Sequence, residues 1–144
     1  MGILKNIKNY VTGGAADVSL TLQHSVLNAD EPLKLLIKVK PTGETIHPKR
    51  VYVIVNAVEQ SSTKNVLFSK EYVLDEDIQI NSDETKEWTY AVELPQEVPS
   101  TVVAKHFKVE WGVKASLDMS GIDPASDWVP FVLNKAMTFE LEDK

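Results

Sequence analysis

The chain has 144 residues, of which 43% are hydrophobic, and a formal net charge of -6 at pH 7. This length suits one domain whose core buries about two-thirds of the unfolded surface. The acidic balance and the single arginine, Arg50, argue against general binding to nucleic acid, because phosphate contacts need clustered Lys and Arg. Without cysteine the chain has no disulfide, no thiol nucleophile and no thiolate metal ligand.

Residues 1–14 predict a short amphipathic helix, because Ile3, Leu4, Ile7 and Val11 recur at helical spacing and a Gly-Gly pair follows them. A helix of this length is marginal in water on its own, so it needs a surface to lie on. We expect that surface to be the protein itself or a second copy, and contact with a membrane surface is the less favoured alternative. No apolar run reaches the roughly 20 residues of a membrane span and no signal peptide is recognised, so we expect a cytoplasmic protein.

Alternating apolar and polar residues after this segment predict half-buried strands, and the almost continuous apolar run at 51–58 predicts a central strand. The predicted strands in this part of the chain are residues 18–26, 33–40, 51–58, 66–74 and 78–80.

The clearest alternation lies between residues 86 and 119. Large apolar side chains fall on one face in 88–94 and again in 107–117, and a proline-bracketed corner joins the two segments. Two such strands make half of a β-sandwich core, in which we expect Phe107 and Trp111 to be buried. The opposite face carries Thr89, Glu93, His106, Lys108, Glu110 and Lys114.

Residues 128–133 and 137–141 predict the last two strands, and Pro130 makes the first of them an edge strand or a bulge. The whole pattern has about eight or nine short strands with no helix-period segments between them. The sequence therefore predicts an all-β, antiparallel, immunoglobulin-like sandwich over residues 15–144, preceded by the short helix.

The order of these segments resembles the N-terminal domain of the arrestin-like superfamily, which includes bacterial sporulation-control proteins of that fold. The similar segments are the turn at 28–32, the lysine-rich strand at 33–40, Leu94-Pro95, Pro99-Ser100 and the aromatic-rich strand at 107–117. The resemblance implies a non-catalytic adaptor that uses sheet edges and loops for protein contacts. The glycine of the family's Pro-Gly-Glu turn is absent, and the family's phosphate-sensing basic residues have no counterpart, so receptor-arrestin activity is not implied.

Acidic loops raise a second interpretation. Asp75 and Asp77 lie beside a short predicted strand, and Asp118, Asp123 and Asp127 lie in one loop, where their carboxylates would suit calcium. No EF-hand spacing is present, and such runs in an acidic protein commonly form solvated loop faces.

Trp128 and Phe131 could form an exposed aromatic pair that contacts carbohydrate or protein, although core packing is the favoured interpretation. No nucleophile elbow, phosphate loop or histidine cluster is present, so no catalytic residue and no cofactor are predicted. We predict a protein-interaction or scaffold module that uses an exposed sheet edge or a second copy, with a calcium- or carbohydrate-binding sandwich as the alternative. The candidate partner-binding residues are Ile3, Leu4, Ile7, Val11, Trp128 and Phe131.

Overall fold

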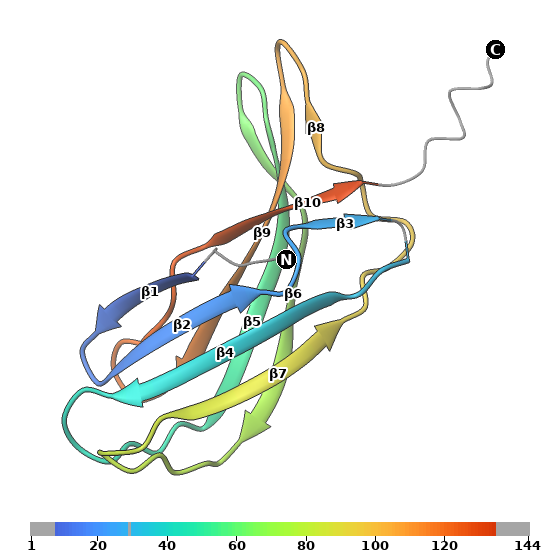
Figure 1. Cartoon of the computed structure of the whole chain (residues 1–144). Helices are drawn as coiled ribbons and strands as arrows, with labels where there is room; N and C mark the ends of the chain where they lie inside the picture. The colour runs from blue at the N-terminus through green and yellow to red at the C-terminus, as the bar shows by residue number, and fades with distance from the viewer. Residues whose placement is uncertain (1–7, 29, 135–144) are drawn as a thin grey trace.

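The computed structural model describes residues 8–28 and 30–134, which form two β-sheets packed face to face (Figure 1). The smaller sheet has the order β1-β2-β4-β7, and the larger has the order β3-β10-β9-β5-β6 with β8 paired to β9. The strands are β1 (Lys8–Gly13), β2 (Ala16–Leu22), β3 (Val26–Asn28), β4 (Leu33–Pro41), β5 (Arg50–Gln60), β6 (Lys64–Glu76), β7 (Lys86–Val92), β8 (Val102–Val103), β9 (Lys108–Asp118) and β10 (Val129–Asn134). The predicted all-β sandwich is confirmed.

The core lies between the two sheets and follows the period-two pattern of the sequence. In β4 the alternate residues Leu33, Leu35, Ile37 and Val39 are buried, as the alternation at 33–40 predicts. From the larger sheet, Trp111 of β9 is 2% exposed and completes the core with aromatic neighbours on both sides.

β5 is the central strand of the larger sheet, as its apolar run predicts. It pairs along its length with β6 on one side and β9 on the other. Its inward residues Val51, Val53, Val55 and Ala57 are fully buried. A strand held on both sides in this way is a rigid support for its neighbours.

The prediction of one strand at 18–26 is wrong. β2 ends at Leu22, and the chain then crosses to the larger sheet, where β3 pairs with β10 in parallel, so the sandwich is not wholly antiparallel. The crossover is marked by the amide of Gln23, which still bonds to β4, and by the carbonyl of Ser25, which accepts from the amide of Val132. Bends at residues 23 and 25 mark the crossover and change the inward face from even-numbered to odd-numbered residues, so Leu22 and Leu27 are buried whereas Val26 is 52% exposed.

The predicted N-terminal helix is corrected from residue 8 onward. Residues 8–13 form β1, which pairs antiparallel with β2 and sets Val11 opposite Val18. Gly14, with φ of 67°, turns the hairpin. Pairing with a neighbouring strand satisfies the backbone of this short segment better than an isolated helix, which is marginal at this length. Ile3, Leu4 and Ile7 lie outside the described residues.

The prediction of an edge strand or a bulge at Pro130 holds only locally. β10 lies between β3 and β9, but residues 129–131 pair with β9 alone and residues 132–134 pair with β3. The amide of Val132 points toward β3. The imide nitrogen of Pro130, two residues earlier, points to the same side but lies just beyond the end of β3. Proline is tolerated there because no neighbouring strand needs its missing donor. Phe107, expected in the core, precedes β9 and is 40% exposed. The predicted strand at 137–141 lies outside the described residues.

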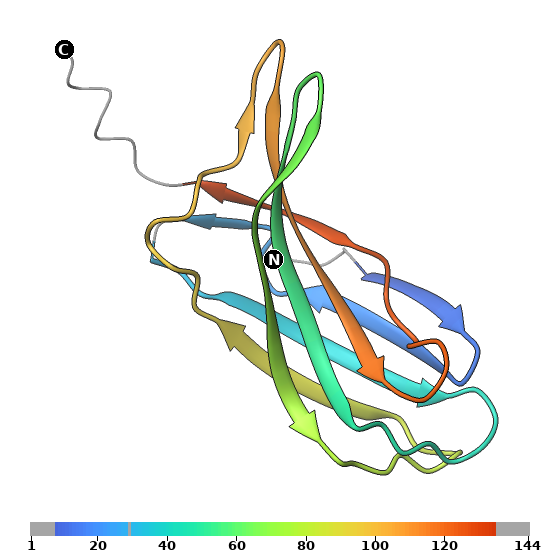
Figure 2. The same ribbon diagram turned by 180° about the vertical axis from the view of Figure 1, so that it is seen from behind.

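The ends of the β5–β6 and β8–β9 hairpins project beyond the smaller sheet, as both views show (Figures 1 and 2). In the part of the chain that the structure describes, no helix is long and apolar enough to cross a membrane.

Candidate protein-interaction site

β6 forms a long edge of the larger sheet. It has 13 residues, and within the described residues it pairs with β5 alone. Three of its apolar side chains are exposed: Val66 by 62%, Leu67 by 44% and Val73 by 39%. An unpaired edge presents backbone N–H and C=O groups to which a further strand can bond. This edge is therefore the strongest candidate for a protein contact.

Two shifts of register divide β6, one on each side of residues 68–73. Such shifts are β-bulges or irregularities that bend an edge strand. Between them, Phe68, Lys70 and Tyr72 lie opposite buried residues of β5 and are directed to the side of the smaller sheet. The alternate residues Ser69 and Glu71 lie on the outer side.

Contacts with the smaller sheet hold the C-terminal part of β6 in place. The indole N–H of Trp88, on β7, donates to the carboxylate of Asp75 at 2.9 Å, and the rings of Tyr72 and Tyr90 lie with centroids 6.5 Å apart. These contacts join β6 to the smaller sheet as well as to β5.

The charges along the edge differ in how they are neutralised. Glu71 accepts from Arg50 at 3.2 Å, and Arg50 also bonds to Asp118 at 3.0 Å. The ammonium of Lys70 lies 5.2 Å from the centroid of the Tyr72 ring, and no carboxylate among the described residues forms an ion pair with it. Lys70 is therefore the charge on this segment that remains open to an outside anion.

The aspartates proposed as calcium ligands act mainly as hydrogen-bond acceptors within the fold. Asp118 pairs with Arg50, and Asp123 accepts from the hydroxyl of Tyr52 at 3.0 Å. Burial raises the pKa of Tyr52, a hydrogen bond with Ser116 lowers it, and Asp123 raises it through a hydrogen bond and its charge. These bonds fasten the loop after β9 to β5.

The remaining calcium candidates do not complete a cluster. Asp75 accepts from Trp88, while Asp77 and Asp127 are exposed on separate loops. Across residues 8–28 and 30–134, no group of three or more His, Cys, Asp or Glu side chains is arranged to hold a metal ion.

Trp128 and Phe131 do not share a surface. Phe131 is 3% exposed and packs against Trp111 with ring centroids 5.7 Å apart. Trp128 is 43% exposed on the outer face, where it covers Gly112 and lies 5.6 Å from the ammonium of Lys114. Only Trp128 of this pair is therefore available for contact with a ligand or a partner.

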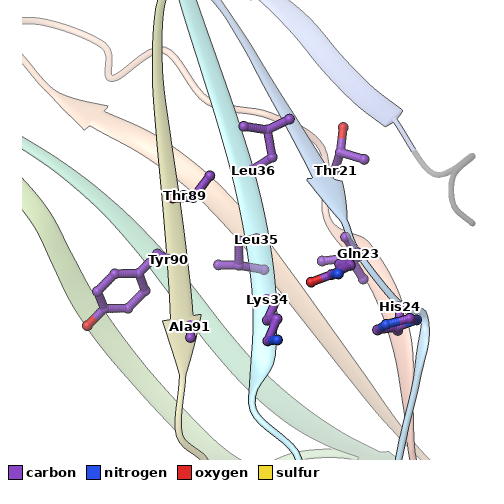
Figure 3. Close-up of a pocket in the computed structure, with 10 residues that line it drawn as sticks. Thr21, Gln23, His24, Lys34, Leu35, Leu36, Thr89, Tyr90 and Ala91 are labelled. Carbon is purple, nitrogen blue, oxygen red and sulfur yellow. The ribbon is translucent and has the colours of Figure 1, made fainter.

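A hollow of about 720 Å³ lies at one end of the smaller sheet (Figure 3). Thr21, Leu36 and Thr89 form a row across its three strands, and Lys34 and His24 also line it. Its lining is largely apolar. Chemically it suits an apolar group with an anionic end, and it is a second, smaller candidate surface.

Sequence reasoning located a strand at 66–74 but did not identify its edge position. The two bulges interrupt the alternation, so its two faces could not be distinguished along the whole strand. One signal was present, since Lys70 and Glu71 stand in the middle of an apolar run, which is typical of protected edge strands.

These features define the class of the protein as a β-sandwich domain of two packed sheets. Among solved structures, the chain is similar to Spo0M, the sporulation control protein from Bacillus subtilis, with a TM-score of 0.68 and 19% sequence identity. The match covers 85% of this chain and 50% of that one, so the chain spans half the length of Spo0M. The predicted arrestin-like fold is confirmed. No protein-family model matches the sequence, and no curated protein matches it either.

Proposed function

We propose that this chain is a non-catalytic protein-interaction module that binds an extended segment of a partner along β6, in the cytoplasm and without a cofactor. The observation that carries the proposal is the unpaired edge of β6 with its exposed Val66, Leu67 and Val73. In strand addition, main-chain hydrogen bonds supply affinity and alternate side chains supply specificity.

The setting of β6 supports this proposal. Its whole length is paired to β5, whose inward residues are fully buried, and its C-terminal part is tied to β7 through Asp75 and Trp88. Binding then orders only the incoming segment, because β6 is already held by these contacts. A preorganised surface lowers the entropic cost of association.

A selection from a library of displayed random peptides tests the proposal. We expect peptides selected on the native chain to perturb and protect the amides of β6 in NMR and hydrogen-exchange measurements. The variant V66K/V73K places lysines on the edge and should weaken their binding by about tenfold or more, since exposed lysines disfavour strand addition.

Val103→Lys is the matched control, because Val103 is 84% exposed and lies on β8 rather than β6. It should bind the selected peptides as the native chain does. If V66K/V73K binds them equally well and the perturbed amides lie away from β6, the assignment of the site is wrong.

A further inference from the structure

We infer that Lys70 determines the specificity of the β6 edge: it excludes pairing with a second copy of this chain and selects a partner strand that places a carboxylate opposite it. This inference rests on the proposed function of β6. It follows from the place of Lys70 in the regular segment at 68–73, from the lack of an ion pair between Lys70 and any carboxylate of residues 8–28 and 30–134, and from the symmetry of strand pairing.

Lys70 occupies an unusual position for a lysine. It lies opposite Val55, which is fully buried, and is therefore directed to the side of the sheet that faces the core. Phe68 and Tyr72 flank it on the same side, and its ammonium contacts the Tyr72 ring. Inward-pointing charges on edge strands are a recognised device against edge-to-edge association.

Symmetry explains why this device acts against a second copy. Two identical edges pair antiparallel around a two-fold axis normal to the sheet, and this axis keeps every side chain on its own face. Residues that lie opposite each other then have their side chains on the same side of the sheet. Because side chains alternate along a strand, this requires the axis to pass midway between one residue and the same residue of the second copy.

The axis positions that use the regular segment best lie at its middle, where they set either Lys70 opposite Lys70 or Glu71 opposite Glu71. Like charges directly opposite each other destabilise a strand pair. Moving the axis toward either end brings one of the bulges into the pairing and loses regular bonds. Every register of self-pairing is therefore penalised.

A different chain meets no such constraint. An antiparallel partner with Asp or Glu opposite Lys70 supplies the missing ion pair, and apolar residues two positions away on each side would contact Phe68 and Tyr72. Glu71, on the other face, already pairs with Arg50, so it should discriminate less strongly between partner strands. The structure thus favours a partner strand of the pattern apolar-x-acidic-x-apolar.

Two capped peptides test the selection, Thr-Val-Thr-Glu-Thr-Val-Thr and the same peptide with Lys in place of Glu. Fluorescence anisotropy should show that the native chain binds the Glu peptide about threefold to tenfold more tightly, and that Lys70→Glu reverses this preference. Lys114→Glu makes the same change of charge on β9, an interior strand, and should keep the native preference.

Self-association gives a second, independent measurement. Sedimentation equilibrium should show that Lys70→Val associates at least about tenfold more strongly than the native chain, with new hydrogen-exchange protection in β6, whereas Lys114→Val does not. Unchanged association of Lys70→Val would overturn the exclusion of a second copy.

The peptide results also separate this inference from the function on which it rests. If both peptides bind the native chain equally and shift the β6 resonances, the role of Lys70 is wrong while β6 remains a docking edge. If neither peptide binds the native chain or any of its variants, strand addition to β6 and the role of Lys70 both fail.

Discussion

Trp111 is the largest of the fully buried side chains, and its indole joins three parts of the sandwich. Its ring lies 5.5 Å from that of Phe68 on β6 and 5.7 Å from that of Phe131 on β10, measured between centroids. Its N–H donates to the carbonyl of Pro99, in the corner before β8, at 2.9 Å. Replacing Trp111 by alanine removes both aromatic contacts and this bond in one step.

We expect Trp111→Ala to lower the free energy of unfolding by about 3–5 kcal/mol, because a large-to-small change loses burial and leaves a cavity. The unpaired carbonyl of Pro99 adds to this loss and favours the upper part of the range. A domain of this kind has a total stability of about 5–15 kcal/mol, so the variant should keep its fold but unfold at a clearly lower urea concentration.

Urea titrations followed by circular dichroism measure this difference, with Lys114→Ala as the control on the opposite face of the same strand. The Lys114 side chain is partly exposed and its ammonium lies against the exposed Trp128 ring, so its loss should change stability by no more than about 0.5 kcal/mol. Similar losses for both variants, or a loss below about 1.5 kcal/mol for Trp111→Ala, would refute the assignment of the inward face.

Further predictions concern tyrosines, calcium and the N-terminal strand. Tyr52→Phe should cost about 1–2 kcal/mol in urea titrations because Asp123 loses the donor hydroxyl and keeps the bond from the amide of Met119. Tyr72→Phe should cost nothing, since the buried Tyr72 hydroxyl has no hydrogen-bond partner among the described residues. Burial raises the pKa of both hydroxyls, so the folded state holds these protons more tightly. Their contribution to stability is fully present below the unfolded pKa of about 10 and is lost as pH rises from there, so the double Phe variant should show a flatter profile in the alkaline range. Millimolar calcium should leave the melting temperature unchanged, and a concentration-dependent rise would restore the calcium-binding alternative. Deleting residues 1–13 should lower the melting temperature in calorimetry because β2 loses its pairing with β1; an unchanged melt would show that β1 adds no stability.

The extent to which the sequence predicts this fold differs from element to element. The lysine-rich strand at 33–40 and the apolar run at 51–58 were predicted correctly, because the first has a clear period of two and the second is a continuous apolar run of strand length. The strand at 18–26 was not, because the chain bends at residues 23 and 25 and changes sheets between β2 and β3. In the sequence Val26 is in phase with Leu22, but after the bends Leu27 is the residue that is buried.

The N-terminal error has a related cause. Ile7 and Val11 satisfy a helical spacing, but the choice between helix and strand for residues 8–13 depends on β2, whose edge offers backbone partners. Local spacing carries no information about an available edge. The prediction of Trp128 and Phe131 as a surface pair failed in part for the same reason, since Phe131 meets Trp111 only after β9 and β10 pair.

The sequence by itself determined the all-β class, the single core and the identity of most inward side chains, because these follow from composition and from a periodicity that neighbouring residues share. Only the tertiary structure decided which strand lies at an edge. Two bulges interrupt the alternation of β6, so its sequence does not show which strands lie beside it. Its edge position follows from the sheet order, in which β5 pairs with β6 on one side and with β9, far along the chain, on the other. That long-range pairing also places Lys70 on an edge strand, where a partner can reach it, because the neighbours of a strand depend on which segments meet in the folded sheet.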